Sequence, residues 1–524
     1  MHNVETIIEP PSIGWSRDIL IQETLFNRRP LVSIIDEGKI LLVSPYEKGE
    51  GELKISLLDS KLEIIKEELV NIDKLNFNLI SPDEIFIDKN RIYWRDRSES
   101  KGYIGEFSND YKEIKIKNIL ENIDYLNQIN HNNISYITTK DSNDRISITM
   151  IGNGEEKTIE GPKGIENVVS TKLAVDDNKM YLIIEQRDST TGFKNILISI
   201  GSNGNWSTPQ KVNEINETRV SIKSTDIVSD GENVYSVLVI QGDDKSRFTY
   251  FVDGINLRNQ ESLETVTLEH GSNSKVGYFS SIPMIVGPLD NGFEIVTTAP
   301  TNIDLYSRNA SNVIKLSIDK EGIKREELLS KTKSWSNRPY YLLNDKEYVF
   351  WNEPEKGNYN TVRAATTEKN VFEKSIKKNS NVVKEAIGEE IPVITSYNIL
   401  YSIGGRLLSL LPALFWLLFM FVNNEKQRNK WNTLFLIGVA IYYVFQLITM
   451  KNIYNPNTLI YMPDFLKING AKIIYPTIFT FIGWYGARLW SGGNKNKEGY
   501  KLYMTFIVFS YLLMNYLYSP YVFK

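Results

Sequence analysis

A recurring unit between residues 29 and 376 restricts the fold of this chain more than any other feature of its sequence. In each copy, a turn rich in Asp, Asn and Gly leads into a short run rich in β-branched and aromatic residues, and this pattern is typical of a strand. Seven landmark residues open these runs, at intervals of 42 to 59 residues. They are Ile40, Ile92, Ile134, Met180, Val234, Phe293 and Tyr348.

Seven units of this length, each with room for about four short strands, predict an all-β propeller of about seven blades over residues 29–376. Packing four-stranded sheets face to face around an axis buries both faces of each sheet and shields its edges. A row of β-sandwiches is the alternative, but no unit reaches the roughly 100 residues of an immunoglobulin-like domain. Counts of six or eight blades stay open because the fifth and sixth units are weakly defined. Residues 1–28 are predicted to be an N-terminal extension.

Apolar stretches dominate the part of the chain that follows the repeats. A membrane-spanning helix needs roughly 17–25 predominantly apolar residues. Four such stretches, with no amphipathic helices to cover them, predict an α-helical transmembrane bundle of about four helices in residues 397–524, after a linker over residues 377–396. The predicted helices lie near residues 399–422, 431–450, 472–490 and 502–523.

The distribution of charge predicts the orientation of this membrane domain. Residues from 391 onward carry 12 Lys+Arg and 3 Asp+Glu, whereas the preceding residues carry 48 and 61. The first and third loops between the apolar stretches hold seven basic residues against three in the middle loop, and short loops rich in Lys and Arg stay in the cytoplasm. The sequence therefore predicts a multi-pass plasma-membrane protein with an extracellular propeller.

Export of the propeller requires a signal that residues 1–28 do not display, because this segment is polar and contains Pro10 and Pro11. We therefore expect the natural chain to begin upstream with a signal peptide or a first helix. If Met1 is the true start, the alternative is a cytoplasmic propeller.

Several classes of function are excluded or disfavoured by composition. The absence of cysteine excludes disulfides, Cys-ligated zinc, iron–sulfur clusters and a thiol nucleophile. The three histidines lie far apart and lack metal-binding spacing, and no phosphate-binding, dinucleotide-binding or nucleophile-elbow motif occurs. The acidic repeat region would repel nucleic acid. We expect no cofactor, no metal ion and no nucleic-acid partner.

Two stretches resemble the sialidase-type, Asp-box β-propellers. Residues 202–209 read S-N-G-N-W-S-T-P, which is similar to the D-G-x-x-W-S-x-P turn of that family with Asn in place of Asp. Arg29-Pro30 resembles the Arg-x-Pro opening of the first sialidase blade, and Asn337-Arg338-Pro339 opens the seventh repeat in the same way. The resemblance implies a propeller in which Arg29 holds a substrate carboxylate. It leaves the catalytic residues unassigned.

Candidate binding residues follow from side-chain chemistry. Aromatic residues beside polar turns offer a platform for a carbohydrate or peptide, with packing between blades as the alternative. Arginines facing the central channel would hold an anion through paired hydrogen bonds. The candidates are Arg29, Trp94, Arg97, Trp351 and Arg363.

Two arginines, Arg406 and Arg488, fall in or beside the predicted membrane helices. A charge inside the bilayer is costly and marks a functional candidate, whereas a charge near a helix end extends to the interface. Interfacial anchoring is the interpretation that we favour for both.

These observations favour a bacterial cell-envelope protein whose propeller binds a glycan, a peptide or a protein partner, and whose helices contact membrane lipid. A membrane-bound sialidase-like glycoside hydrolase is one alternative. An accessory subunit of a membrane transport or export complex is another, because four helices exceed what a simple anchor requires.

Overall fold

The computed structural model describes residues 9–24, 29–35, 38–46, 51–72, 74–77, 79–80, 84–152, 155–176, 179–202, 204–218, 220–270, 276–301, 310–332, 334–354, 360–376, 407–423, 430–454, 462, 464–490 and 499–522. The chain divides into two compact units. One comprises Pro10–Asn302 and Asn309–Lys377 and is built from β-sheets, and the other contains the long helices.

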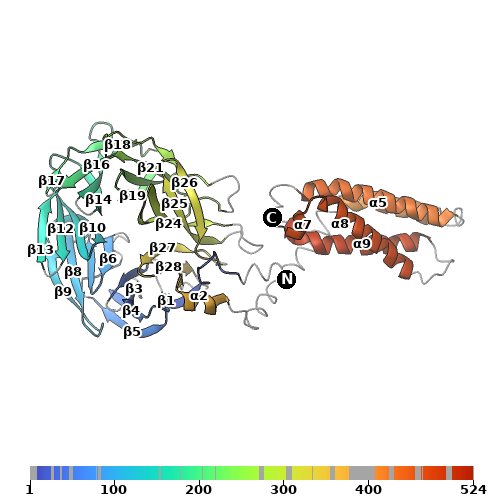
Figure 1. The fold of residues 1–524 in the computed structure, drawn as a ribbon, viewed down its shortest axis with the longest axis horizontal. Helices are drawn as coiled ribbons and strands as arrows, with labels where there is room; N and C mark the ends of the chain where they lie inside the picture. The colour runs from blue at the N-terminus through green and yellow to red at the C-terminus, as the bar shows by residue number, and fades with distance from the viewer. Residues whose placement is uncertain are drawn as a thin grey trace. The chain divides into compact units, whose positions relative to one another are not determined.

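Seven antiparallel sheets, which we call blades 1 to 7, form the first unit. Figure 1 shows them arranged around a central axis. Blade 1 consists of β2 (Leu31–Ile34), β3 (Ile40–Pro45), β4 (Glu52–Leu58) and β5 (Ile64–Asn71). Blade 2 consists of β6 (Ile85–Asp88), β7 (Arg91–Asp96), β8 (Lys101–Phe107) and β9 (Ile114–Leu120). Blade 3 consists of β10 (Ile123–His131), β11 (Ile134–Asp141), β12 (Ile146–Gly152) and β13 (Glu155–Glu160).

The remaining blades follow the same order, with a fifth strand in blade 4. Blade 4 consists of β14 (Val168–Asp176), β15 (Lys179–Arg187), β16 (Lys194–Ser202), β17 (Asn205–Trp206) and β18 (Gln210–Ile215). Blade 5 consists of β19 (Ser221–Ser229), β20 (Asn233–Gln241), β21 (Thr249–Asn256) and β22 (Val266–Thr267). Blade 6 consists of β23 (Met284–Leu289), β24 (Gly292–Pro300), β25 (Ser311–Asp319) and β26 (Gly322–Leu328). Blade 7 consists of β27 (Asn337–Leu343), β28 (Glu347–Pro354), β29 (Asn360–Thr366) and β1 (Ile19–Thr24).

The prediction of a seven-bladed propeller is confirmed. Each landmark residue lies in the second strand of its own blade, from Ile40 in β3 to Tyr348 in β28. The first strands of successive blades contact one another in a closed ring, from β2 through β6 and onward to β27, which again contacts β2. These first strands therefore line the axis.

Strand β1 closes this ring, because it pairs with β29 and so completes the last blade from the other end of the repeat region. The register runs antiparallel from Ile19 opposite Ala364 to Thr24 opposite Asn360. A strand of blade 7 thus lies inside residues 1–28, which the sequence suggested to be an extension. Its partner is distant in the sequence, so no local turn signal marks the pairing.

Apolar clusters fill all seven interfaces between neighbouring blades. The cluster between blades 7 and 1 joins Ile21 of β1 to Val32, Leu42 and Phe350. The cluster between blades 6 and 7 includes Trp15, which precedes β1. Burial of apolar area at each interface supplies the main favourable term for the ring.

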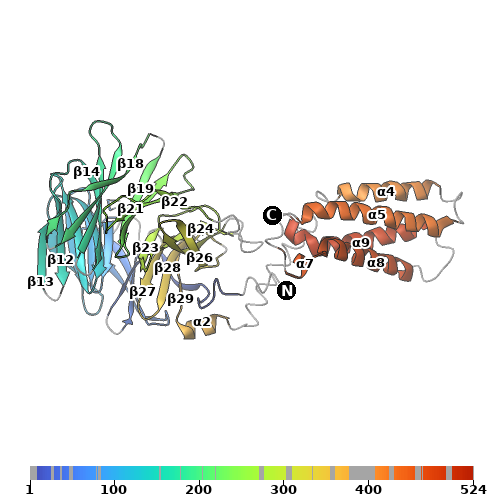
Figure 2. The ribbon, with the colours of Figure 1, turned by 45° about the horizontal axis from the view of Figure 1, so that its top comes forward.

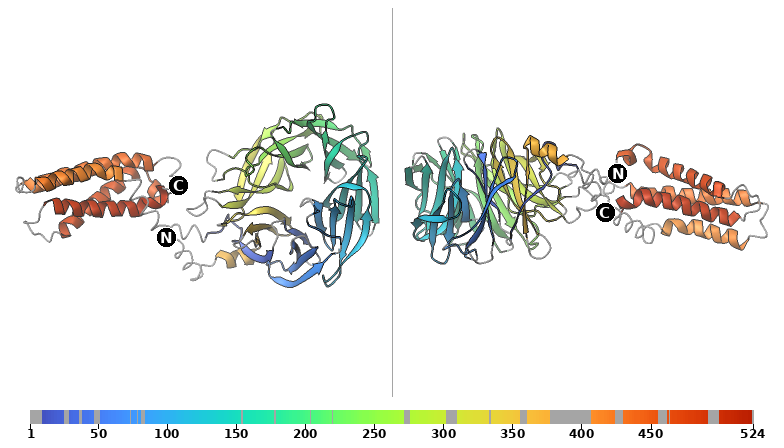
Figure 3. Two further views of the ribbon diagram at one scale, coloured as in Figure 1. Left: turned by 180° about the vertical axis from the view of Figure 1, so that it is seen from behind. Right: turned by 90° about the horizontal axis from the view of Figure 1, so that it is seen from below.

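The helices begin with α2 (Lys369–Ile376), which belongs to the first unit. Four long helices, α4 (Leu407–Val422), α5 (Trp431–Ile453), α8 (Ala471–Trp490) and α9 (Gly499–Val522), form the second unit with the short α7 (Asp464–Lys467). Figures 2 and 3 show these four helices side by side. Two apolar clusters lie among them, one around Phe435 and Phe506 and the other around Met450 and Met514.

One helix in the described part of the chain is long and apolar enough to cross a membrane, namely residues Trp431–Lys451, with a mean hydropathy of 1.9. The described apolar part of α4, Leu410–Val422, is shorter. The four predicted helices are therefore present as helices, and their number of membrane crossings stays a prediction.

The closure by β1 can be tested with two substitutions in the same strand. Ile21 is buried between blades 7 and 1, whereas Leu20 is 54% exposed. We expect Ile21→Ala to lower the free energy of unfolding of the propeller by about 2–5 kcal/mol, because it leaves a cavity at the closure. We expect Leu20→Ala to change it by about 0.5 kcal/mol or less. Urea unfolding followed by the β-sheet circular dichroism signal measures both, and equal effects of the two substitutions would contradict this role of β1.

Candidate functional site

The two Arg-Pro openings noted in the sequence meet at the propeller axis. Arg29 lies two residues before β2, and Arg338 is the second residue of β27. Both line a pocket of about 280 Å³, which we call the axial pocket. The ring closure causes this meeting, because it places β2 of blade 1 against β27 of blade 7.

Blades 5 and 6 complete the axial pocket. Lys245 and Phe248 come from the connection between β20 and β21, and Ser280 and Ser281 precede β23. The other lining residues are Ile282 and Asn337. The pocket therefore gathers three cationic side chains and several hydroxyl and amide groups, and no carboxylate is among the residues that line it.

The backbone at Arg338 is unusual. Its φ of +52° lies in the left-handed region that non-glycine residues rarely adopt, and the pairing of β27 with β28 shifts register between Asn337 and Tyr340. A bulge of this kind redirects a side chain, and backbone strain is concentrated at functional sites. The local geometry therefore places the guanidinium at the pocket at a cost in backbone energy.

Three hydrogen bonds position the pocket wall. The Arg29 Nη2 donates a hydrogen bond to the Ile282 carbonyl oxygen at 3.4 Å, which joins blade 1 to blade 6. Ser280 shares hydroxyl hydrogen bonds with Thr298 at 3.0 Å and with Ser311 at 2.7 Å. These contacts preorganise the wall before any ligand arrives.

Tyr340 lies in the same axial strand as Arg338, two residues further along β27. Burial raises the pKa of its phenol to about 12, and the positive charge of Arg29 opposes part of that rise. A second axial cavity of about 270 Å³ is lined by Tyr340 together with Asp88, Lys89 and His131. The charge of Asp88 also acts on Tyr340, so this residue lies between a cationic and an acidic region.

The second axial cavity has internally paired polar groups. Asn130 donates to Asp88 at 3.1 Å, and the Lys89 backbone N–H donates to the Ser33 hydroxyl at 2.8 Å. Burial raises the pKa of the Asp88 carboxyl. These bonds connect the turns of blades 1 to 3, so we assign the cavity a structural role.

The predicted aromatic platform is not formed by Trp94 or Trp351, because both side chains are fully buried. Trp94 packs between blades 1 and 2, stacked on Tyr103, and its indole N–H donates to the Lys74 carbonyl oxygen at 3.2 Å. Trp351 packs between blades 6 and 7 and donates to Glu353 at 2.8 Å. The alternative of packing between blades describes both residues.

Arg97 and Arg363 form ion pairs, and neither is among the residues that line the axial pocket. Arg97 pairs with Glu84 at 3.1 Å, and Arg95 pairs with the same carboxylate at 2.8 Å. Arg363 lies in β29, two strands away from the axial strand β27, and pairs with Glu353 at 2.8 Å. Burial raises the pKa of the Glu353 carboxyl, and the charge of Arg363 opposes this rise.

Of the two arginines predicted to lie in or beside membrane helices, the structure describes one. Arg406 lies outside the described residues. Arg488 lies two residues before the end of α8, where its Nη2 donates to Asn432 at 3.3 Å and its guanidinium lies 5.5 Å from the centre of the Phe435 ring. A position near a helix end agrees with the interpretation as an interfacial anchor.

The Asp-box-like segment forms a hairpin in blade 4. Gly204 adopts a φ of +83°, and β17 turns back so that Trp206 pairs with Gly201. The Trp206 indole N–H donates to the Glu160 carbonyl oxygen at 2.9 Å, which ties blade 4 to the last strand of blade 3. This segment is therefore a folding element of the propeller.

Of the comparisons with known proteins, only that with solved structures finds similar chains. No family model and no curated protein matches the chain. Similar solved structures include the β-propeller domain of the Trilobed protease from Pyrococcus furiosus, at 11% identity over 62% of this chain and 92% of that chain, with a TM-score of 0.36. Polysaccharide lyase Uly1 matches at 9% identity over 66% of this chain and 90% of that chain, with a TM-score of 0.45.

Neuraminidase-like propellers are also among the similar structures. A subtype N11 neuraminidase-like protein from a flat-faced bat virus matches at 9% identity, over 67% of this chain and 93% of that chain, with a TM-score of 0.32. Likeness at this level concerns the propeller fold alone. The chain is thus a seven-bladed β-propeller followed by a helical region.

Sequence reasoning identified Arg29 but did not assign a binding role to Arg338, Lys245 or the two serines. The repetition of Arg-Pro at the starts of the first and seventh repeats was the available signal for Arg338. Lys245 lies in a polar turn that resembles the corresponding turns of other blades, so nothing local distinguishes it.

The hairpin in blade 4 yields a testable prediction. A Cβ atom on Gly201 would lie 2.8 Å from ring atoms of Trp206, whose movement is restricted by its bond to Glu160. We expect Gly201→Ala to lower the free energy of unfolding by about 1–3 kcal/mol through overpacking. Gly242→Ala is the matched control, because no atom lies within 4 Å of its added Cβ. Urea unfolding compares the two variants, and an unchanged Gly201→Ala midpoint would refute the packing argument.

Proposed function

We propose that this protein is a cell-envelope binding protein whose propeller recognises the carboxylate of an acidic glycan, or a similar anionic group on a partner, at the axial pocket. Four helices would anchor the propeller in the plasma membrane. Propellers serve as binding and scaffold modules in many settings, so the fold is compatible with this role without specifying the ligand.

The observation that carries the proposal is the cationic lining of the axial pocket. Arg29, Lys245 and Arg338 line it from three blades, and no carboxylate is among its lining residues. Guanidinium groups bind carboxylates through paired, charge-assisted hydrogen bonds, and the neighbouring hydroxyls supply further donors and acceptors. Positive charge in a concave site attracts an anion and orients it.

The surface of the helical unit supports membrane anchoring. All four long helices carry large apolar side chains that are more than half exposed. Examples are Phe415 in α4, Ile448 in α5, Phe481 in α8 and Leu512 in α9. Such extensive apolar exposure is unfavourable in water and favourable against lipid. The basic loops of the sequence support an orientation with the propeller outside the cell.

Binding at the axial pocket can be tested with defined glycans. We expect sialyllactose or oligogalacturonate to bind the full chain in preference to lactose, because only the first two carry a carboxylate. Arg29→Gln and Arg338→Gln should each raise Kd by about tenfold or more, since each removes a charge-assisted hydrogen bond. Calorimetry measures these affinities, with the exposed Arg145→Gln as a control for loss of one positive charge elsewhere.

Two outcomes would oppose this proposal. Equal binding of lactose and of the acidic glycans would show that the carboxylate is not recognised. Unchanged affinity in both arginine variants would place the site elsewhere. Release of free sugar during the titration would instead support the alternative of a membrane-bound glycoside hydrolase.

The predicted orientation has its own test. Protease treatment of intact cells should remove the propeller, as detected with antibodies against residues 29–376, while a cytoplasmic control protein survives. Survival of the propeller until the cells are lysed, in cells whose known surface protein is cleaved, would place it in the cytoplasm. An intracellular scaffold would then replace the envelope receptor.

A further inference from the structure

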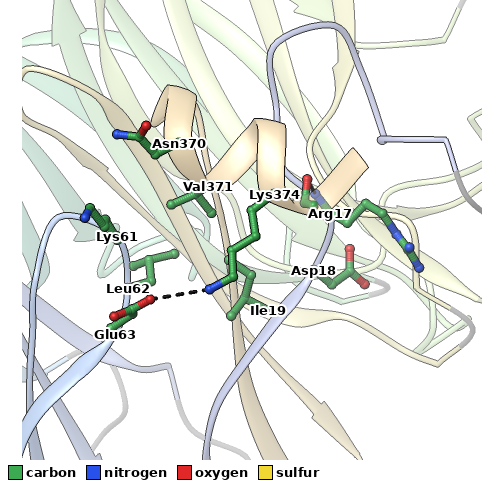
Figure 4. Close-up of a pocket in the computed structure, with 10 residues that line it drawn as sticks. Arg17, Asp18, Ile19, Lys61, Leu62, Glu63, Asn370, Val371 and Lys374 are labelled. Atoms are coloured by element: carbon green, nitrogen blue, oxygen red, sulfur yellow. Dashed lines mark hydrogen bonds and ion pairs between the residues drawn. The ribbon is translucent and has the colours of Figure 1, made fainter. Parts of the chain in front are cut away.

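A cavity lies away from the axis, at the seam that β1 closes. Its volume is about 650 Å³, within the range of cavities that hold small organic ligands. Its walls are the start of β1, the turn between β4 and β5, and helix α2. We call it the seam pocket, and Figure 4 shows the side chains that line it.

The seam pocket has an apolar floor. Leu62 and Val371 are 4% and 7% exposed, and Ile19 of β1 lies beside them. Leu62 is held in a turn with a φ of +63°, in which Asp59 accepts the backbone N–H groups of Lys61 and Glu63 at 2.9 Å each. The floor is therefore fixed by backbone hydrogen bonds and by helix packing.

Positive charge surrounds this floor. Figure 4 shows Arg17 and Lys61 on opposite sides of the apolar residues, with Lys374 of α2 between them. Lys374 is already paired, because its Nζ lies 3.5 Å from the Glu63 carboxylate. No described residue forms a hydrogen bond or salt bridge with the side chain of Arg17 or Lys61, and the hydrogen bonds of these two residues involve their backbone groups.

The one remaining carboxylate of the seam pocket is Asp18. Its Oδ1 accepts the backbone N–H of Lys331 at 3.2 Å. Burial raises the pKa of this carboxyl, although the charges of Arg363 and Arg17 act against the rise. With Glu63 occupied by Lys374, the cationic groups of the pocket exceed the acidic groups available to neutralise them.

We infer that the seam pocket binds an elongated anionic amphiphile, with its phosphate or carboxylate group at one of the two cationic ends and its apolar part on the floor of Ile19, Leu62 and Val371. A phospholipid and a soluble phosphate ester share this chemistry. Helix α2 is followed along the chain by the linker to the helical region. Because we propose that this region lies in the membrane, an anionic lipid is the first ligand to test.

Such a ligand would contact three segments that are distant in the sequence, around residues 17–19, 61–63 and 370–375. A ligand that binds only the folded state raises the free energy of unfolding. Well above Kd, this increase grows with the logarithm of the ratio of ligand concentration to Kd. The ligand would therefore strengthen the closure of the ring. None of the seam-pocket residues lines the axial pocket, so this inference and the proposed function succeed or fail separately.

The experiment uses the full chain in a neutral detergent and three probes. These are dihexanoylphosphatidylglycerol below its micelle concentration, inorganic phosphate, and zwitterionic dihexanoylphosphatidylcholine. We expect phosphatidylglycerol to bind in calorimetry and to raise the unfolding midpoint of the propeller. Arg17→Gln or Lys61→Gln should raise its Kd by about tenfold, through loss of a charge-assisted contact. Lys112→Gln, an exposed lysine in the turn between β8 and β9, is the matched control.

The outcomes separate the sources. Equal affinity for inorganic phosphate would show that the apolar floor contributes nothing to binding, and would overturn the amphiphile as the ligand. Equal affinity for phosphatidylcholine would overturn the role of negative charge. Failure of both anionic probes to bind would overturn the inference, as would binding that neither Arg17→Gln nor Lys61→Gln weakens. Because Lys61 is exposed, its variant should fold normally and remains informative if Arg17→Gln does not.

Discussion

The pairing of β1 with β29 is the interaction on which the rest of the propeller depends. It converts an open row of seven sheets into a ring, and so removes the two exposed sheet faces that an open row would leave. Ile21 then joins the cluster between blades 7 and 1, so backbone pairing and apolar burial act at one place. The axial pocket and the seam pocket both arise at this junction, because blade 1 and blade 7 contribute to each of them.

The role of a residue in the propeller depends on where it lies in its blade. Large aromatic side chains such as Trp94 and Trp351 fill the interfaces between blades, and their indole N–H groups are satisfied by a carbonyl and a carboxylate. Charged residues away from the axis form pairs across strands, as Arg363 does with Glu353. The starts of the first strands of blades 1 and 7 carry Arg29 and Arg338, which line the axial pocket. The proposed binding chemistry thus lies at the ends of strands, while the strand centres hold the blades together.

The sequence predicted the blade count and the second strand of each blade, because those strands are rich in β-branched and aromatic residues and follow a polar turn. The same pattern could not separate a ligand platform from packing between blades. Ile92, Tyr93 and Trp94 are all fully buried, so alternation along this strand does not identify an exposed face. The sequence could not predict β1 as part of blade 7, because its pairing with β29 is entirely non-local. It placed Arg29 and Arg338 at equivalent strand starts, but their meeting depends on that same closure.

The closure has a consequence for biosynthesis. During translation, the segment with β1 is made before blade 1, and its pairing partner β29 is made only after blades 1 to 6 have been synthesised. Until then, apolar side chains such as Ile21 and Val32 lack their contacts in blade 7. Non-local pairing of this kind slows folding and leaves aggregation-prone intermediates. The long apolar helices follow the last blade in the chain, so ring completion and synthesis of these helices fall within the same short interval. The nascent chain is therefore expected to rely on chaperones most while blade 7 is being made.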